Sequence, residues 1–184
     1  DALERIDGKG VTDAMIQAAQ AGPAEASKAM LAILSTRKVE QAVPTAYKLA
    51  ADASFGARAE AARLIGALGG AEDVAKLTGL LLAEKDGGMA GEYANALRSA
   101  AIRAKQADPV IAAVAKADDA TKARLLEILG GVQGPQALAT LKGQLGSTNL
   151  DVRKAAVSAL KGWTSADPMA DLLKIAQTDS DNAC

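Results

Sequence analysis

The side chains that could do chemistry in this 184-residue chain are mostly carboxylates. Neighbouring acids include Glu72-Asp73, Asp118-Asp119, and Asp179 with Asp181. Two carboxyl groups at a suitable separation can serve as the general acid and general base of a hydrolytic enzyme. The first two pairs, however, stand just before runs of helically spaced apolar residues, where an acid stabilises a helix start through the helix dipole. These acids therefore indicate helix starts rather than an active site.

Histidine is absent from the sequence, and cysteine occurs once, as the terminal Cys184. Without histidine there is no His-dependent nucleophilic triad and no His-ligated zinc, iron or haem. A single cysteine cannot form an intrachain disulfide or a Cys-rich metal site, so Cys184 is either a free thiol or an incidental terminal residue. We therefore expect no catalytic residue, no cofactor, no metal ligand and no enzymatic activity.

Two glycine-rich segments have the composition, but not the context, of phosphate-binding loops. The segments are "GALGG" at residues 66–70 and "GGVQG" at residues 130–134. Both follow helical patterns, whereas a dinucleotide or phosphate loop follows a strand. We expect both segments to end helices, with the turns at Gly69-Gly70 and Gly130-Gly131.

The charge balance argues against a nucleic-acid partner. Lys and Arg number 21 against 22 Asp and Glu, for a formal net charge of −1. Proteins that bind nucleic acids normally carry a basic excess or a basic face. No apolar run approaches the roughly 20 residues of a membrane-spanning helix, so no membrane span is expected either.

Composition also indicates the fold class. Hydrophobic residues make up 49% of the chain, but aromatic residues only 2%. Alanine, the best helix former, is frequent, while β-branched and aromatic residues are scarce. The sequence therefore predicts an all-α protein with an aliphatic, alanine-rich core.

An apolar stripe with helical spacing recurs along the chain. In "DVRKAAVSALKGW", residues 151–163, it consists of Val152, Ala155, Ala156, Ala159, Leu160 and Trp163. The large aliphatic residue of each stripe, here called the anchor, recurs at near-equal intervals: Leu3, Leu34, Ile65, Leu97, Leu129 and Leu160. A fixed period of about 31 residues, as in this series, is the signature of a solenoid. Alanine on the stripe would let neighbouring helices approach closely.

Each period contains a second helical pattern, which begins after a Gly, Pro, Asp or Ser break. We expect its first core residue nine positions after the anchor, at Val43, Val74, Leu138 and Met169. The fourth unit departs from this pattern because its first helix runs on through "AAIRAKQ" and its second is late and short. The fold prediction is a right-handed α-solenoid of about five helical hairpins plus a partial N-terminal repeat. The expected repeats of this single array, residues 1–184, are 1–22 (partial), 23–53, 54–86, 87–117, 118–147 and 148–184.

The segment "DVRKAAVSALKGWTSADPMADLLKIA" resembles a HEAT repeat of the short bacterial type that is grouped with phycobilisome-lyase-like repeats. Residues 57–81 and 120–145 are similar to it, and residues 24–50 and 89–116 more loosely so. The resemblance implies that Arg58, Lys122 and Arg153 form rungs of a polar ladder between repeats with acidic neighbours such as Asp151, the alternative being partner binding. Trp163 occupies the position of Leu68 and Val132 in other units, so we expect it to pack in the core rather than to serve as a ligand platform. The last stretch is also similar to HEAT regions of secreted, multidomain bacterial proteins. This implies a fragment of a longer chain and an extracytoplasmic location, either periplasmic or secreted.

The resulting functional hypothesis is a non-enzymatic interaction scaffold, monomeric as a fragment, that binds another protein or a neighbouring domain. Its second helices would present the side chains 11 and 14 positions after each anchor: Thr45, Lys48, Lys76, Gly79, Thr140, Gly143, Asp171 and Lys174. The alternative is a passive spacer in a multidomain secreted protein. A HEAT-like lyase or DNA glycosylase is disfavoured, since a glycosylase needs a basic, aromatic-bearing groove.

Overall fold

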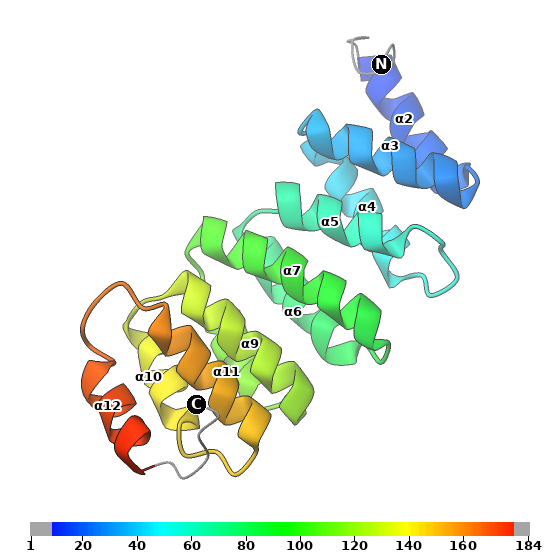
Figure 1. Cartoon of the computed structure of the whole chain (residues 1–184). Helices are drawn as coiled ribbons and strands as arrows, with labels where there is room; N and C mark the ends of the chain where they lie inside the picture. The colour runs from blue at the N-terminus through cyan, green and yellow to red at the C-terminus, as the bar shows by residue number, and fades with distance from the viewer. Residues whose placement is uncertain (1–8, 179–184) are drawn as a thin grey trace.

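The computed structural model describes residues 9–178, which form a series of α-helices joined by short turns (Figure 1). The elements are α2 (Lys9–Ala21), α3 (Ala24–Thr36), the 3-10 helix η1 (Glu40–Ala42), α4 (Val43–Ala51), α5 (Arg58–Leu68), α6 (Ala71–Ala83), α7 (Gly87–Ala104), α8 (Asp108–Val114), α9 (Asp119–Val132), α10 (Pro135–Gln144), α11 (Leu150–Lys161) and α12 (Met169–Thr178). This part of the chain contains no β-strand.

The helices lie in two layers. Successive first helices α3, α5, α7, α9 and α11 lie side by side and form the first-helix layer (Figure 1). The second helices α4, α6, α8, α10 and α12 follow them in the chain and form the second-helix layer. The prediction of an all-α array of helical hairpins is therefore confirmed for the described residues.

The anchors form the centre of the core. Leu34, Ile65, Leu97 and Leu129 are fully buried, and so, almost completely, is Leu160. The sixth anchor, Leu3, lies outside the described residues. Trp163 packs partly buried against the core, as do Leu68 and Val132 at the same position of other units. The predicted core role of Trp163 is thus confirmed.

The apolar face of the second helices agrees with the prediction except at the last one. Val74 is buried, and Val43 and Leu138 pack partly buried against the core. Met169 is 52% exposed, so its predicted core position is wrong. Among the described helices α12 packs mainly on α11, which leaves the outer side of Met169 uncovered.

Carboxylates stabilise helix starts, as predicted. The Asp118 carboxylate accepts a hydrogen bond from the Thr121 amide at 2.8 Å, and this bond lowers the pKa of Asp118. The Asp73 carboxylate accepts one from the Gly70 amide at 2.7 Å. Both acids satisfy amide groups that have no partner within the helix.

Only one of the two glycine pairs acts as predicted. Gly69 and Gly70 form the turn between α5 and α6, but Gly130 and Gly131 lie inside α9. The turn after α9 uses Gln133 and Gly134 instead, with φ values of 62° and 99°. The predicted helix stop at Gly130-Gly131 is therefore wrong.

Close packing explains the glycine inside α9. A Cβ atom on Gly130 would lie 2.8 Å from the Ala159 Cβ of α11. The same contact recurs two units earlier, where a Cβ on Gly66 of α5 would lie 2.6 Å from the Ala96 Cα of α7. In both pairs the glycine follows one anchor and the alanine precedes the next, so small residues let the first helices approach at these junctions.

The fourth unit has the long first helix and short second helix that were predicted. Helix α7 has 18 residues and α8 has 7. The extension carries Arg103, whose guanidinium donates to the carbonyls of Gly66, at 3.1 Å, and Gly69, at 2.5 Å. The longer helix thereby places a positive charge at the C-terminal end of α5, where carbonyl groups lack partners.

Candidate partner-binding surfaces

The predicted partner-facing residues all lie on second helices and are all at least partly exposed. Their positions are Thr45 and Lys48 on α4, Lys76 and Gly79 on α6, Thr140 and Gly143 on α10, and Asp171 and Lys174 on α12. Helix α8, the short one, contributes none of them. Their joint use as a binding face remains a prediction.

Several of these side chains have partners within the chain. The Asp171 carboxylate pairs with Lys142 Nζ at 2.8 Å, which links α12 to α10. The Thr140 hydroxyl donates to the Gln136 carbonyl at 2.9 Å. Lys76 contacts both an aromatic ring and a carboxylate, as described below. The polar residues of this layer therefore stabilise the array as well as facing solvent.

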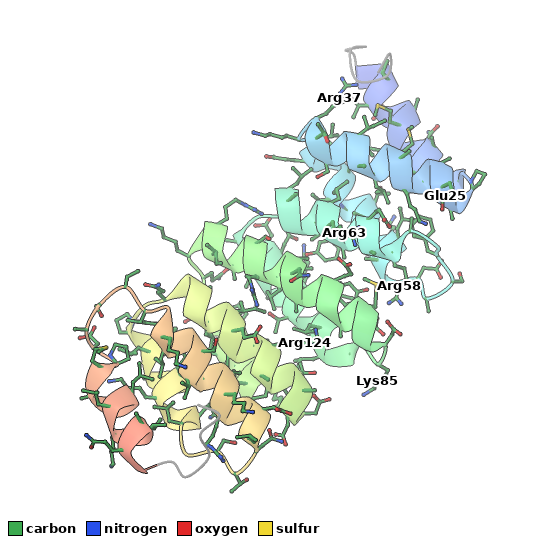
Figure 2. All side chains as sticks on the ribbon, in the orientation of Figure 1. Glu25, Arg37, Arg58, Arg63, Lys85 and Arg124 are labelled. Atoms are coloured by element: carbon green, nitrogen blue, oxygen red, sulfur yellow. The ribbon has the colours of Figure 1, made fainter. Side chains whose placement is uncertain are left out.

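Arg58, which is labelled in Figure 2, forms a rung of the predicted polar ladder. Its Nε donates to the Ala50 carbonyl at 2.9 Å, and its Nη2 pairs with Glu84 Oε2 at 2.6 Å. The Tyr93 hydroxyl of the next unit donates to the same Ala50 carbonyl at 2.6 Å. Backbone hydrogen bonds from Asp86 and Lys85, together with Arg58, lower the pKa of Glu84 despite its burial.

The two equivalent basic residues differ from each other. Arg153, like Arg58, donates to a carbonyl of the preceding unit, that of Ser147, at 2.8 Å. Lys122 instead pairs with Asp119 of its own helix at 3.6 Å. The ladder inferred through Lys122 is therefore wrong.

Ion pairs between neighbouring first helices use other residues. They are Arg63–Glu92 at 2.5 Å and Arg98–Glu127 at 3.0 Å. Because the side chains of Arg63 and Arg98 are substantially exposed, each of these pairs stabilises the fold only slightly.

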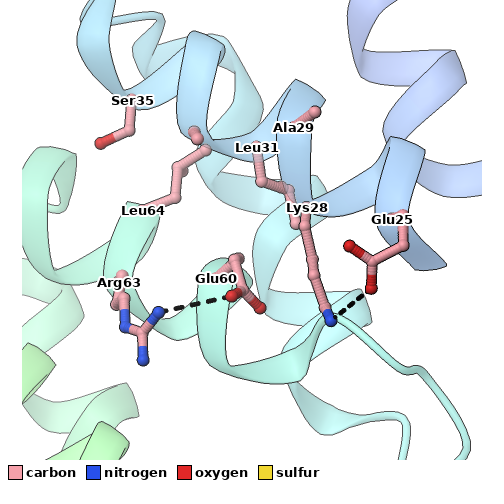
Figure 3. Close-up of a pocket in the computed structure, with 9 residues that line it drawn as sticks. Glu25, Lys28, Ala29, Leu31, Ser35, Glu60, Arg63 and Leu64 are labelled. Carbon is pink, nitrogen blue, oxygen red and sulfur yellow. Dashed lines mark hydrogen bonds and ion pairs between the residues drawn. The ribbon is translucent and has the colours of Figure 1, made fainter.

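A cavity of about 580 Å³ opens between α3 and α5, and is called the α3–α5 groove (Figure 3). Its apolar lining includes Leu31, Ala32 and Leu64. Its rims carry two ion pairs, Lys28–Glu25 at 2.8 Å and Arg63–Glu60 at 3.3 Å. The hydrogen bond from Lys28 to Glu25 raises the pKa of Lys28.

Two residues of this groove occupy repeat positions that are small at the close junctions, where a glycine after one anchor meets an alanine before the next. The corresponding residues here are Ser35 and Leu64, and both line the groove.

A second cavity, of about 340 Å³, is lined mainly by residues of the second helices α4 and α6 and is called the α4–α6 pocket. Its lining includes Val43, Pro44, Tyr47, Leu68, Gly70, Glu40, Glu72, Asp73 and Lys76. The Lys76 ammonium lies 5.2 Å from the centre of the Tyr47 ring and 3.2 Å from Asp73 Oδ1. The Tyr47 hydroxyl donates to the Asp73 carbonyl at 3.3 Å. Burial, with the negative charges of Asp73 and Glu72, raises the pKa of Tyr47 well above its ordinary value.

Neither cavity was predicted from the sequence. Both depend on residues of adjacent repeats that meet across a helix interface, such as Tyr47 and Lys76 or Ser35 and Leu64. For the α4–α6 pocket the available signal was the aromatic Tyr47, since the same position of the later units has no aromatic residue.

Residues 9–178 lack two other features that would indicate a function, a metal-binding cluster and a membrane-spanning helix. No group of three or more His, Cys, Asp or Glu side chains in residues 9–178 is arranged to hold a metal ion. In the same part of the chain, no helix has the length and apolar character needed to cross a membrane.

Comparison with protein families finds a match in the second part of the chain. Residues 107–184 match a family model described as HEAT repeats, and the match begins just before α8. No curated protein sequence matches the chain. The matched region contains the same alternation of first and second helices that continues upstream to α3.

Proposed function

Residues 107–184 belong to the HEAT-repeat family, and on that premise we propose that the chain is a scaffold that binds a partner through its second-helix layer. HEAT repeats generally serve as protein-interaction scaffolds, and stacked repeats provide extended surfaces for this purpose. The partner is another protein or a neighbouring domain of the same chain. No catalytic role is assigned to any residue.

The observation that carries this proposal is the exposure of equivalent positions on several second helices, α4, α6, α10 and α12. Lys48 and Lys174, which occupy the same position relative to their anchors, are exposed on α4 and α12. Thr45 and Thr140, which also share a position, are at least partly exposed. Small and polar side chains of both charges suit a protein partner better than a nucleic acid, which calls for a basic surface.

A passive spacer between other domains is the alternative function. It would use the same fold, but would need no specific contact on the second-helix layer. The two functions therefore differ in whether one layer is selectively contacted in the source cell.

Site-specific photo-cross-linking tests the proposal. Benzoylphenylalanine replaces Lys48 or Lys174 on the second-helix layer and, as matched controls, the exposed Ser99 or Ser158 on the first-helix layer. After irradiation in extract of the source organism, we expect discrete adducts from Lys48 and Lys174 only. Adducts from none of the four positions would favour the spacer. Equal adducts from all four would contradict a layer-specific interface.

A further inference from the structure

The α4–α6 pocket combines features that the other units lack. At the position that Tyr47 occupies relative to its anchor, the later units have Thr78, Val110, Lys142 and Leu173. At the position of Asp73, the other described units have Ala42, Lys105, Ala137 and Pro168. An aromatic ring and a buried carboxylate at these two repeat positions therefore occur together at this junction alone among the described repeats. Neither residue continues the repeat pattern.

The charges of the pocket favour a cation. Three carboxylates, those of Glu40, Glu72 and Asp73, line it together with a single cation, Lys76. Asp73 is 3% exposed, so its charge is poorly screened by water. Arg103, held by the carbonyls of Gly66 and Gly69, is not among the lining residues.

The ammonium group of Lys76 already occupies the position in the pocket that a bound cation would favour. The Lys76 ammonium contacts both the Tyr47 ring and Asp73, as a bound cation would, because an aromatic face attracts positive charge. Yet the Lys76 side chain is 57% exposed and has a flexible four-carbon stem. The contact with an exposed lysine is weak enough for a competing cation to replace it.

We propose that the α4–α6 pocket receives the guanidinium group of an arginine presented by the partner protein, which displaces the Lys76 ammonium from the Tyr47 ring. The inference rests on the proposed function and names the chemistry of its partner. A planar guanidinium can stack on the Tyr47 ring while its edges donate to both Asp73 and Glu72, and its fork of donors suits paired carboxylates better than the compact ammonium of Lys76. The volume of about 340 Å³ is at the small end of ligand pockets and suits one long side chain. Val43, Pro44 and Leu68 would cover its methylene groups.

The test is an NMR titration of the full chain with N-acetyl-arginine amide. Acetyl-citrulline amide, which has nearly the same shape but no charge, is the matched control. We expect saturable shifts of the Tyr47, Asp73 and Lys76 signals with the arginine probe only. Equal shifts with citrulline, or shifts spread over both layers, would overturn the proposal.

Three variants make the test sharper. Removing the internal competitor by Lys76→Met should raise the affinity for the arginine probe by roughly fivefold. Tyr47→Leu and Glu72→Gln should each lower it by a similar factor. An unchanged or reduced affinity of Lys76→Met would contradict the displacement of Lys76. A circular dichroism spectrum of each variant checks that the helices are intact.

The outcomes separate this inference from the proposed function. Cross-links from positions 48 and 174 without arginine binding would support the scaffold function and contradict the proposal that the α4–α6 pocket binds arginine. Specific arginine binding without cross-links would support the pocket and contradict a partner spread over the whole second-helix layer.

Discussion

Replacing Leu129 with alanine should lower the free energy of unfolding by about 2–5 kcal/mol, the usual range for a buried leucine. Leu129 is fully buried in α9, and α9 packs between α7 and α11 in the first-helix layer. The variant removes apolar contacts and leaves a cavity that close-packed neighbours cannot easily refill. Urea denaturation followed by circular dichroism measures the effect.

The matched control is Ser158→Ala on the neighbouring helix α11. Ser158 is exposed, so its replacement should change the unfolding free energy by no more than about 0.5 kcal/mol. Equal denaturation midpoints for Leu129→Ala and Ser158→Ala would mean that the anchor register is wrong.

Glycine-to-alanine substitutions at two helical sites should have opposite signs. Alanine favours a helix over glycine by about 0.5–1 kcal/mol. At Gly66, however, the added Cβ would lie 2.6 Å from the Ala96 Cα, and backbone atoms cannot move aside without separating α5 from α7. We expect Gly66→Ala to destabilise the protein by about 1–3 kcal/mol, as overpacked cores do.

Gly79 in α6 provides the control for this prediction. It has open space where a Cβ would stand, with no heavy atom within 4 Å. Gly79→Ala should therefore stabilise the protein by about 0.5–1 kcal/mol. Stabilisation by both substitutions would show that α5 and α7 are not in close contact at Gly66.

The repeat register could be predicted because it depends on patterns within each helix. The anchors Leu34 to Leu160 recur at a near-constant interval, and burial of the anchor follows from helical spacing alone. The long α7 was also predictable, because its apolar spacing continues without a break. These features need no knowledge of which residues meet across an interface.

The role of Gly130 inside α9 depends on a contact between helices and was not predicted from the pattern within one helix. Both Gly130-Gly131 and Gly69-Gly70 are glycine pairs, but Gly130 directly follows its anchor, as Gly66 does, whereas Gly69 stands four positions after Ile65. The contact with Ala159, on the next first helix α11, shows that Gly130 permits close packing rather than a turn. The same limit applies to Lys76, which was predicted to face a partner but whose ammonium lies over the Tyr47 ring.

Hydrogen exchange on the complex with the cross-linked partner tests the proposed interface most directly. Deuterium uptake is compared between the chain alone and the chain with its partner. If the second-helix layer is the binding surface, protection should concentrate in peptides from α4, α6 and α10, and those from α5, α7 and α9 should change little. Protection confined to the first-helix layer would contradict the proposed interface.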